Sequence, residues 1–285
     1  MKTVGVIGGS GLYELEGLKD IEFISVQTPW GKPSDDLVVG RLGATKMVFL
    51  PRHGRGHRII PSEINYRANI YAFKKLGANF IISVSAVGSM REDIAPGHIV
   101  IPSQFFDHTK NRVSTFFGDG LVAHVSMADP VCPVLSENLY AASNRLGATV
   151  HNGGVYICIE GPQFSSRAES NIYRKWGVDV IGMTNMPEAK LAREAEICYA
   201  TLALSSDYDC WHDSHSDVTV EDIVQILAKN SELAKGILRE VVDLIGEDRN
   251  CVCSNALQNA IITSKDSITE DAKERLRLIL RGYIS

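Results

Sequence analysis

Phe80-Ile81-Ile82-Ser83-Val84-Ser85-Ala86-Val87-Gly88-Ser89 is the stretch of sequence that decides the fold. It begins as a continuous apolar run, which is typical of a strand buried on both faces of a sheet. Small and polar residues follow at its end. Just before it, the segment from Pro61 and Ser62 has apolar residues at helical spacing and ends at Gly77, a natural helix stop. A helix followed directly by a buried strand predicts an α/β fold.

The rest of the chain repeats this alternation of strand-like and helical patterns. Expected strands are Val4–Ile7, Phe23–Val26, Leu37–Arg41, Lys46–Leu50, Val155–Ile159, Val178–Gly182 and Ile197–Ser206. Expected helices are one over 135–146, one from an N-cap at Thr219 to Ile245, and a short one capped by Thr269. No repeat or linker interrupts the pattern. We therefore expect one domain over residues 1–285, a central mixed β-sheet flanked by helices, with a tail (246–285) whose role stays open.

The composition is that of an ordinary globular protein, with 45% hydrophobic and 22% charged residues. A net charge of −5 argues against nucleic acid as a partner, because a nucleic-acid binder needs a basic surface. No apolar run is long enough to cross a bilayer, and the N-terminal run is too short for a signal peptide. These features predict a cytoplasmic protein with no membrane partner.

Six cysteines stand at positions 132, 158, 198, 210, 251 and 253. The pair Cys251-x-Cys253 has no second ligand pair at zinc spacing in the sequence, so we expect no metal site. Reduced structural thiols are the preferred interpretation in a chain of this length.

Five segments with glycine, hydroxyl or charged residues follow strand-like runs, where open α/β sheets bind ligands. They are Gly8–Gly11, Pro51–Arg58, Ser83–Ser89, Glu160–Glu169 with Gly182–Asn185, and Ser205–Trp211. Glycine-rich turns and arginines suit phosphate, although a tight turn, a solvated basic loop and a buried turn remain the alternatives. Asp207 and Asp209, two residues apart on extended chain, would face the same side. The set predicts a phosphate pocket beside an acidic pocket.

In chain order these segments resemble the 5′-methylthioadenosine phosphorylases of the trimeric purine nucleoside phosphorylase family, over about Val4 to Ile245. The motifs that carry the resemblance are Gly-Gly-Ser-Gly-Leu-Tyr, Leu-Pro-Arg-His-Gly-Arg-Gly-His, Asn-Tyr-Arg-Ala-Asn, Val-Ser-Ala-Val-Gly-Ser, Ile-Glu-Gly-Pro-Gln-Phe-Ser-Ser-Arg-Ala-Glu-Ser and Asp-Tyr-Asp-Cys-Trp. The resemblance implies a fold of the nucleoside phosphorylase type and a homotrimer or homohexamer. It also implies a Cys251–Cys253 disulfide and a Cys132 near Cys198, as in thermophilic relatives.

The resemblance also implies a role for each site residue. The catalytic residues would be Asp207 and Asp209, which would face N7 and the 6-amino edge of the purine. Inorganic phosphate would be bound by Ser10, Arg52, His53, Ser85, Ala86 and Thr184. The nucleoside would contact Met183 at the ribose, Phe164 and Ser165 at the base, and Val220, His57 and a neighbouring subunit's His124 at the 5′-substituent.

The expected reaction is phosphorolysis of 5′-methylthioadenosine to adenine and 5-methylthioribose 1-phosphate. Phosphate is then a co-substrate, and neither a cofactor nor a metal is expected. The nearest alternative is a purine nucleoside phosphorylase with a broader range that includes adenosine, inosine and guanosine. A 6-oxopurine pocket would favour a donor such as asparagine where this chain has Asp207. A nucleosidase using water and a non-catalytic nucleotide-binding module are further alternatives, but neither needs both the Arg-His motif and the Asp pair.

Overall fold

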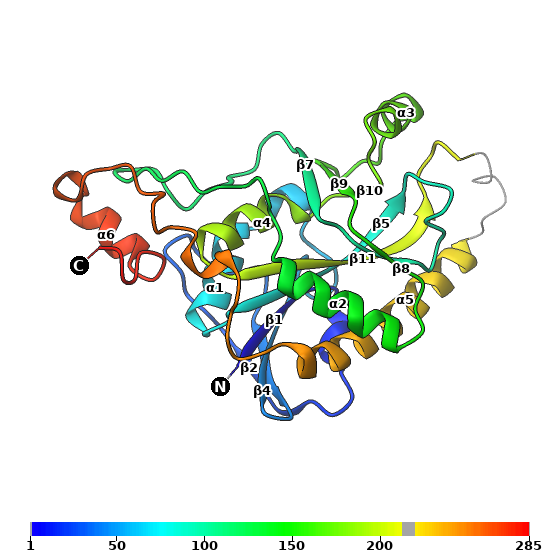
Figure 1. Ribbon diagram of the computed structural model, residues 1–285, viewed down its shortest axis with the longest axis horizontal. Helices are drawn as coiled ribbons and strands as arrows, with labels where there is room; N and C mark the ends of the chain where they lie inside the picture. Colours follow the sequence, from blue (N-terminus) through cyan, green and yellow to red (C-terminus); the bar gives the residue numbers. More distant parts are fainter. Residues whose placement is uncertain (1, 213–219, 285) are drawn as a thin grey trace.

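The strand β5 (Phe80–Ser89) lies at the centre of the sheet, as its apolar run predicts. It pairs in parallel with β1 (Thr3–Gly8) on one side and with β11 (Cys198–Tyr208) on the other. Its last two residues also pair with the antiparallel β10 (Val180–Gly182). The computed structural model shown in Figure 1 describes residues 2–212 and 220–284.

The sheet is mixed, as expected, and extends from β5 in both directions. Its main path runs in the order β2-β3-β4-β1-β5-β10-β9-β7. The bounds are β2 (Lys19–Ile24), β3 (Leu37–Leu42), β4 (Thr45–Pro51), β9 (Val155–Ile159) and β7 (Gln104–His108). From β11 a branch continues to β6 (Ile99–Ile101) and β8 (Val150–Asn152).

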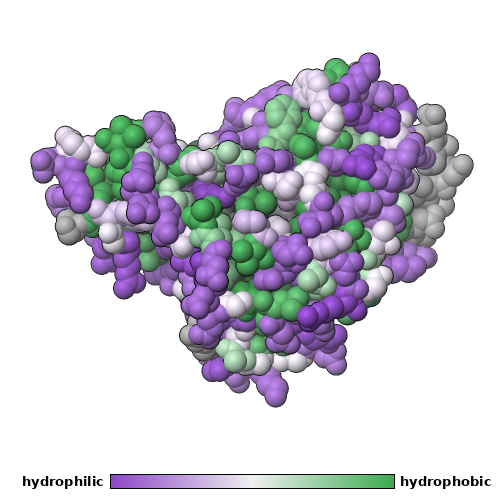
Figure 2. Space-filling view, viewed as in Figure 1, coloured by the Kyte–Doolittle hydropathy of each residue, from purple (hydrophilic) through white to green (hydrophobic). Residues whose placement is uncertain are grey.

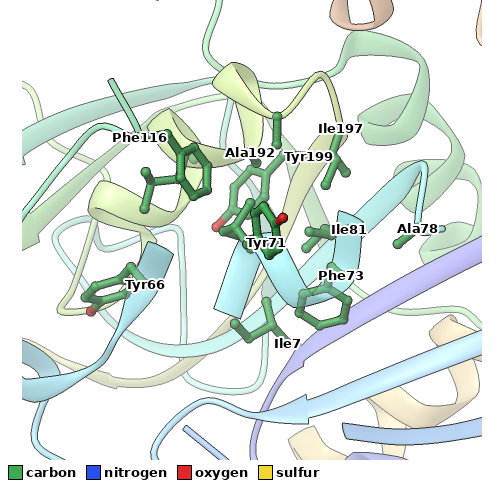
Figure 3. Packing of buried hydrophobic residues seen from close by; sticks show 14 of the residues in the cluster. Ile7, Tyr66, Tyr71, Phe73, Ala78, Ile81, Phe116, Ala192, Ile197 and Tyr199 are labelled. Carbon is green, nitrogen blue, oxygen red and sulfur yellow. The ribbon is translucent and has the colours of Figure 1, made fainter. Parts of the chain in front are cut away.

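Helices cover both faces of this sheet (Figure 1). The helices α1 (Tyr66–Lys75) and α4 (Asn185–Glu194) share one apolar cluster with Ile7 and Ile81, whose packing against Phe73 and Tyr71 is visible in Figure 3. The helices α2 (Pro133–Arg145) and α5 (Val220–Leu244) share another cluster with Val6 and Ile82. Side chains of adjacent strand residues point to opposite faces of the sheet. Successive residues such as Val6 and Ile7 therefore pack into the two different apolar clusters.

Local chemistry sets the helix boundaries, with one departure from expectation. The helix expected from Pro61 to Gly77 is present as α1 but begins only at Tyr66. Pro61–Glu63 form a separate 3₁₀ turn, because Ile64 is extended and the Asn65 side chain caps α1 by accepting from the amide of Ala68. Gly77 adopts a φ of 86° just beyond α1, as a helix stop requires. Thr269 caps α6 (Glu270–Leu276), as expected. The expected N-cap Thr219 lies outside the described residues.

Five elements were not expected from the sequence: β6, β7, β8, α3 (Arg167–Lys175) and α4. The three strands have only three to five residues each, too few for a clear alternation. Ser166 and Glu169 form a capping box that starts α3, within the segment Glu160–Glu169 that the sequence predicts as a ligand-binding loop. Pro187 breaks the helical pattern in the sequence of α4, and Met186 within α4 has non-helical backbone angles.

The later part of the tail, 257–284, packs against the segment 116–131 and forms, with it, a lobe that projects from the body (Figures 1 and 2). The amide of Ile262 donates to the Val122 carbonyl at 2.9 Å, and Ala260 accepts from the amide of His124 at 2.8 Å. Apolar tail residues join the cluster of α1 and α4. Within the described ranges, no helix has the length and apolar character needed to span a membrane.

Candidate active site

The site forms where β5 changes partners. On one side β1 pairs with β5 only as far as Ser83, and β10 pairs from Gly88 onward. The residues between them, Val84–Val87, have no strand partner on that side in these two pairings. The carbonyl of Val84 accepts instead from the Arg52 guanidinium at 3.1 Å. Within this break Ala86 is exposed, whereas its neighbours Ser85 and Val87 are buried.

Arg52 is held rigidly at this break. Its side chain is almost fully buried and forms a bidentate pair with Glu188 of α4, with Nε to Oε2 at 2.8 Å and Nη2 to Oε1 at 3.0 Å. Further donations reach the Ile7 carbonyl at 3.2 Å and the Ser83 hydroxyl at 2.6 Å. Burial alone would lower the pKa of Arg52, but the Glu188 carboxylate outweighs it and raises that pKa. The cation is therefore permanent and preoriented.

The neighbouring basic loop is less cationic than its sequence suggests. Arg55 pairs with Asp35, and Arg58 donates to the Ser34 carbonyl at 3.1 Å. Burial lowers the pKa of His53 to about 4, so this imidazole is neutral at neutral pH. Its Nδ1 lies 2.8 Å from the Ile59 carbonyl, which can only accept, so Nδ1 carries the proton. Nε2 of His53 is then an acceptor, suited to a protonated phosphate oxygen.

Hydroxyl and amide groups of Ser85, Tyr156, Thr184, Asn185 and Thr201 form a cluster beside Ala86. We call this cluster, with Ala86 and Arg52, the cradle. Ser85 donates to the Asn185 side chain at 3.4 Å, and Asn185 donates to the Thr201 hydroxyl. The Tyr156 hydroxyl is fully buried beside those of Ser85 and Thr184, yet it makes no hydrogen bond of good geometry with a described residue. An unsatisfied buried hydroxyl here fits an acceptor supplied by a ligand.

The two acidic residues, Asp207 in β11 and Asp209 just after it, lie beside the same strand, β5. A Cβ built on Gly88 of β5 would lie 3.6 Å from Oδ2 of Asp207 and 3.5 Å from Cβ of Asp209. Asp209 is buried, and its amide donates to the Ser89 carbonyl at 3.0 Å. Asp207 accepts from the Ser206 hydroxyl at 2.6 Å. The two carboxylates thus lie beside β5, three residues beyond Ser85.

The loop after β9 lies between Met183 and the acidic pair. A Cβ on Gly161 would be 2.6 Å from the sulfur of Met183, and Gly161 has a φ of 66° that glycine adopts without strain. At the other end of the loop, Cys210 donates to the Ser165 carbonyl at 3.4 Å. The ring of Phe164 is 85% exposed. The structure thus brings Met183 and Ser165 to the site and leaves the Phe164 ring at its rim.

Three residues that support the site were missed by the sequence analysis. Arg112 donates to the carbonyls of Met183, Met186 and Glu160, each at 2.6 Å, and so joins the two loops that line the site. Glu188 and Tyr199 hold Arg52, since the Tyr199 hydroxyl donates to Glu188 Oε1 at 2.9 Å. The only available signal was indirect, because a buried arginine requires a carboxylate partner somewhere in the chain.

The remaining predicted residues are His57, His124, Ser10 and Val220. His57 stacks on His53 with ring centroids 4.3 Å apart. His124 is exposed and lies beside the tail, at a cavity of about 320 Å³ that Arg193 and Asn255 also line. The side chains of Ser10 and Val220 lie outside the described part. A cavity of about 480 Å³ beside Arg91 and Arg174 is lined by none of the predicted site residues. We therefore locate the site from the positions of the strand ends and not from this cavity.

The chain matches known proteins over most of its length. Residues 3–243 match the model of the phosphorylase superfamily. The S-methyl-5′-thioadenosine phosphorylase of Geobacter sulfurreducens is 63% identical over 284 residues, which cover 99% of each chain.

Solved structures that are similar to this one include the following two. A methylthioadenosine phosphorylase from an Antarctic soil metagenomic library superposes with a TM-score of 0.95 at 49% identity, covering 98% of this chain and 99% of that one. A variant of the adenosine/methylthioadenosine phosphorylase of Schistosoma mansoni, in complex with methylthioadenosine, has a TM-score of 0.78 at 38% identity, covering 87% of this chain and 93% of the other.

Proposed function

The chain belongs to the phosphorylase superfamily, and from that premise we propose that it cleaves 5′-methylthioadenosine with inorganic phosphate. The products are adenine and 5-methylthioribose 1-phosphate. The names of its relatives support this substrate. The observation that carries the proposal is the position of the two pockets on β5, with the cradle at Ser85 and Ala86 and the carboxylates at Gly88. Three residues of strand span about 10 Å, which accommodates phosphate, sugar and purine in a row.

The phosphate pocket and the acidic pocket each meet one chemical requirement of the reaction. Cleavage of the C1′–N9 bond builds positive charge on the sugar, and a phosphate anion held beside Arg52 stabilises that charge and then bonds to C1′. The electrons of the broken bond go to the purine, which leaves easily only when N7 receives a proton or a strong hydrogen bond. Asp207, when protonated, supplies it, and the nearby Asp209 helps to orient the 6-amino edge. Met183 packs against the ribose.

We also propose the features that accompany this activity in the resemblance. No metal or organic cofactor takes part in the reaction, and the protein acts in the cytoplasm. The assembly is a homotrimer or homohexamer, in which His124 completes a neighbour's pocket. The projecting lobe favours such contacts, because Val122 and Ile262 on it are 47% and 64% exposed, and apolar atoms are visible on it in Figure 2.

A phosphate-dependence assay tests the proposed reaction. Methylthioadenosine, adenosine and inosine are each incubated with the enzyme in phosphate-free buffer and again with phosphate added, and release of free base and sugar phosphate is followed. We expect turnover of methylthioadenosine only with phosphate. Equal turnover without phosphate would identify a hydrolase, and a preference for inosine would identify the broader purine nucleoside phosphorylase.

A further inference from the structure

Four cysteines that are distant in sequence meet at one point of the fold. Cys132 precedes α2, Cys198 begins β11, and Cys251 and Cys253 lie at the start of the tail. Their sulfur atoms all lie within 4.8 Å of one another, and those of Cys198 and Cys251 are 3.4 Å apart. Cys132 lies near Cys198, as the resemblance implies, but all four are free thiols, so the implied Cys251–Cys253 disulfide is not formed.

We propose that Cys132, Cys198, Cys251 and Cys253 bind one Zn²⁺ ion in a tetrahedral four-thiolate site. This site is separate from the phosphorolysis site and does not depend on the proposed function. The reason for expecting no metal was that Cys251-x-Cys253 lacks a second ligand pair, and the tertiary structure supplies that pair. Zinc binds thiolates at about 2.3 Å, which places the sulfurs of a regular tetrahedron about 3.8 Å apart. The observed spacing brackets this value.

The chemistry around the cluster favours zinc over other ions. An all-sulfur ligand set excludes the hard cations magnesium and calcium, which prefer oxygen. Nη1 of Arg193 lies 3.6 Å from the sulfur of Cys253, where it offsets part of the charge of four thiolates. Zinc binding releases the thiol protons that remain.

The burial pattern fits a structural ion. Cys132, Cys198 and Cys253 are buried, whereas Cys251 is half-buried and leaves a route for the metal. The ion would join α2, the central strand β11 and the tail at one point. The tail otherwise connects to the body through contacts such as the donation from the Leu257 amide to Glu196 Oε1 at 3.1 Å. Zinc therefore anchors the lobe on which His124 lies.

Metal analysis of the full-length protein tests the proposal. The protein is purified without chelators from cells grown with zinc in the medium, and zinc, iron and free thiols are measured together with the native mass. We expect one zinc per chain, and six reactive thiols after denaturation with a chelator. A chain with no metal, whether it carries two disulfides or six free thiols after dialysis against zinc, overturns the proposal. Stoichiometric iron in place of zinc also overturns it.

Variants assign the ligands. Cys253→Ser and Cys132→Ser should each reduce bound zinc from one per chain to background, and Cys210→Ser, a cysteine outside the cluster, should retain one. If a ligand variant does not fold, zinc is removed from the unmodified protein with a mercurial and chelator and then added back. Removal should speed proteolytic cleavage near residues 246–250, and added zinc should restore resistance. Unchanged cleavage, or a ligand variant that keeps its zinc, contradicts the assignment.

Discussion

Replacing Arg52 by methionine should cost far more stability than the loss of a single phosphate contact. The guanidinium is 2% exposed, and its partner Glu188 is fully buried. Without the cation, the Glu188 carboxylate stays buried, with the hydroxyl of Tyr199 as a remaining donor. Removing one member of a buried pair costs about 3–5 kcal/mol, out of a typical total stability of about 5–15 kcal/mol. We expect the free energy of unfolding to fall by that amount.

A double variant separates this structural role from the role in phosphate binding. Arg52→Met with Glu188→Leu removes both charges and leaves apolar side chains of similar volume, so it should recover most of the lost stability. Use of phosphate should stay impaired, because the charge-assisted contact is still missing. That contact is worth about 1.5–3 kcal/mol, or about 10- to 150-fold in kcat/KM for phosphate.

The measurements are urea unfolding, with m-values compared between variants, and kcat/KM for phosphate at saturating nucleoside. The matched control is Arg55→Met in the same loop, since its pair with Asp35 is partly exposed and worth at most about 1 kcal/mol. An Arg52→Met variant that loses less than about 1 kcal/mol would refute the structural argument. Full recovery of phosphate use in the double variant would refute the binding role.

Three further predictions concern the base, a buried acid and the assembly. Asp207→Asn should lower kcat/KM for methylthioadenosine about 10²-fold, since a hydrogen bond of about 2–3 kcal/mol is lost, and should raise the relative use of inosine; an unchanged ratio means that Asp207 does not recognise the base. Burial raises the pKa of Glu194 to about 7, above its unfolded value, so stability should be lost as the pH rises through 4.5 to 7. Between pH 5 and pH 8 the unmodified protein should lose about 3 kcal/mol of unfolding free energy, and Glu194→Gln should lack this loss. The same pH dependence in both proteins contradicts the prediction. Light scattering should show a trimer or hexamer, and an active monomer contradicts that assembly.

The sequence by itself determined the fold class, the central strand and the segments that converge on the site. These features have local causes. A continuous apolar run such as Phe80–Ile82 suits a strand with two buried faces, and a glycine such as Gly77 is a common helix stop. The Asp207 and Asp209 pair could be placed on one side of a strand end, because two residues is the repeat of extended chain. The short strands β6 and β8 lacked enough residues to show any such repeat.

Only the tertiary structure decided which side chains meet. Arg52 and Glu188 are 136 residues apart, and their pairing depends on how α4 packs against α1 and β11. The neutral state of His53 depends on burial that no neighbour in sequence predicts. In the same way, Cys132 and Cys198 reach Cys251 and Cys253 because α2, β11 and the tail begin at one place. Contacts between distant segments follow from sheet order and helix packing, and they leave no periodic pattern in the sequence.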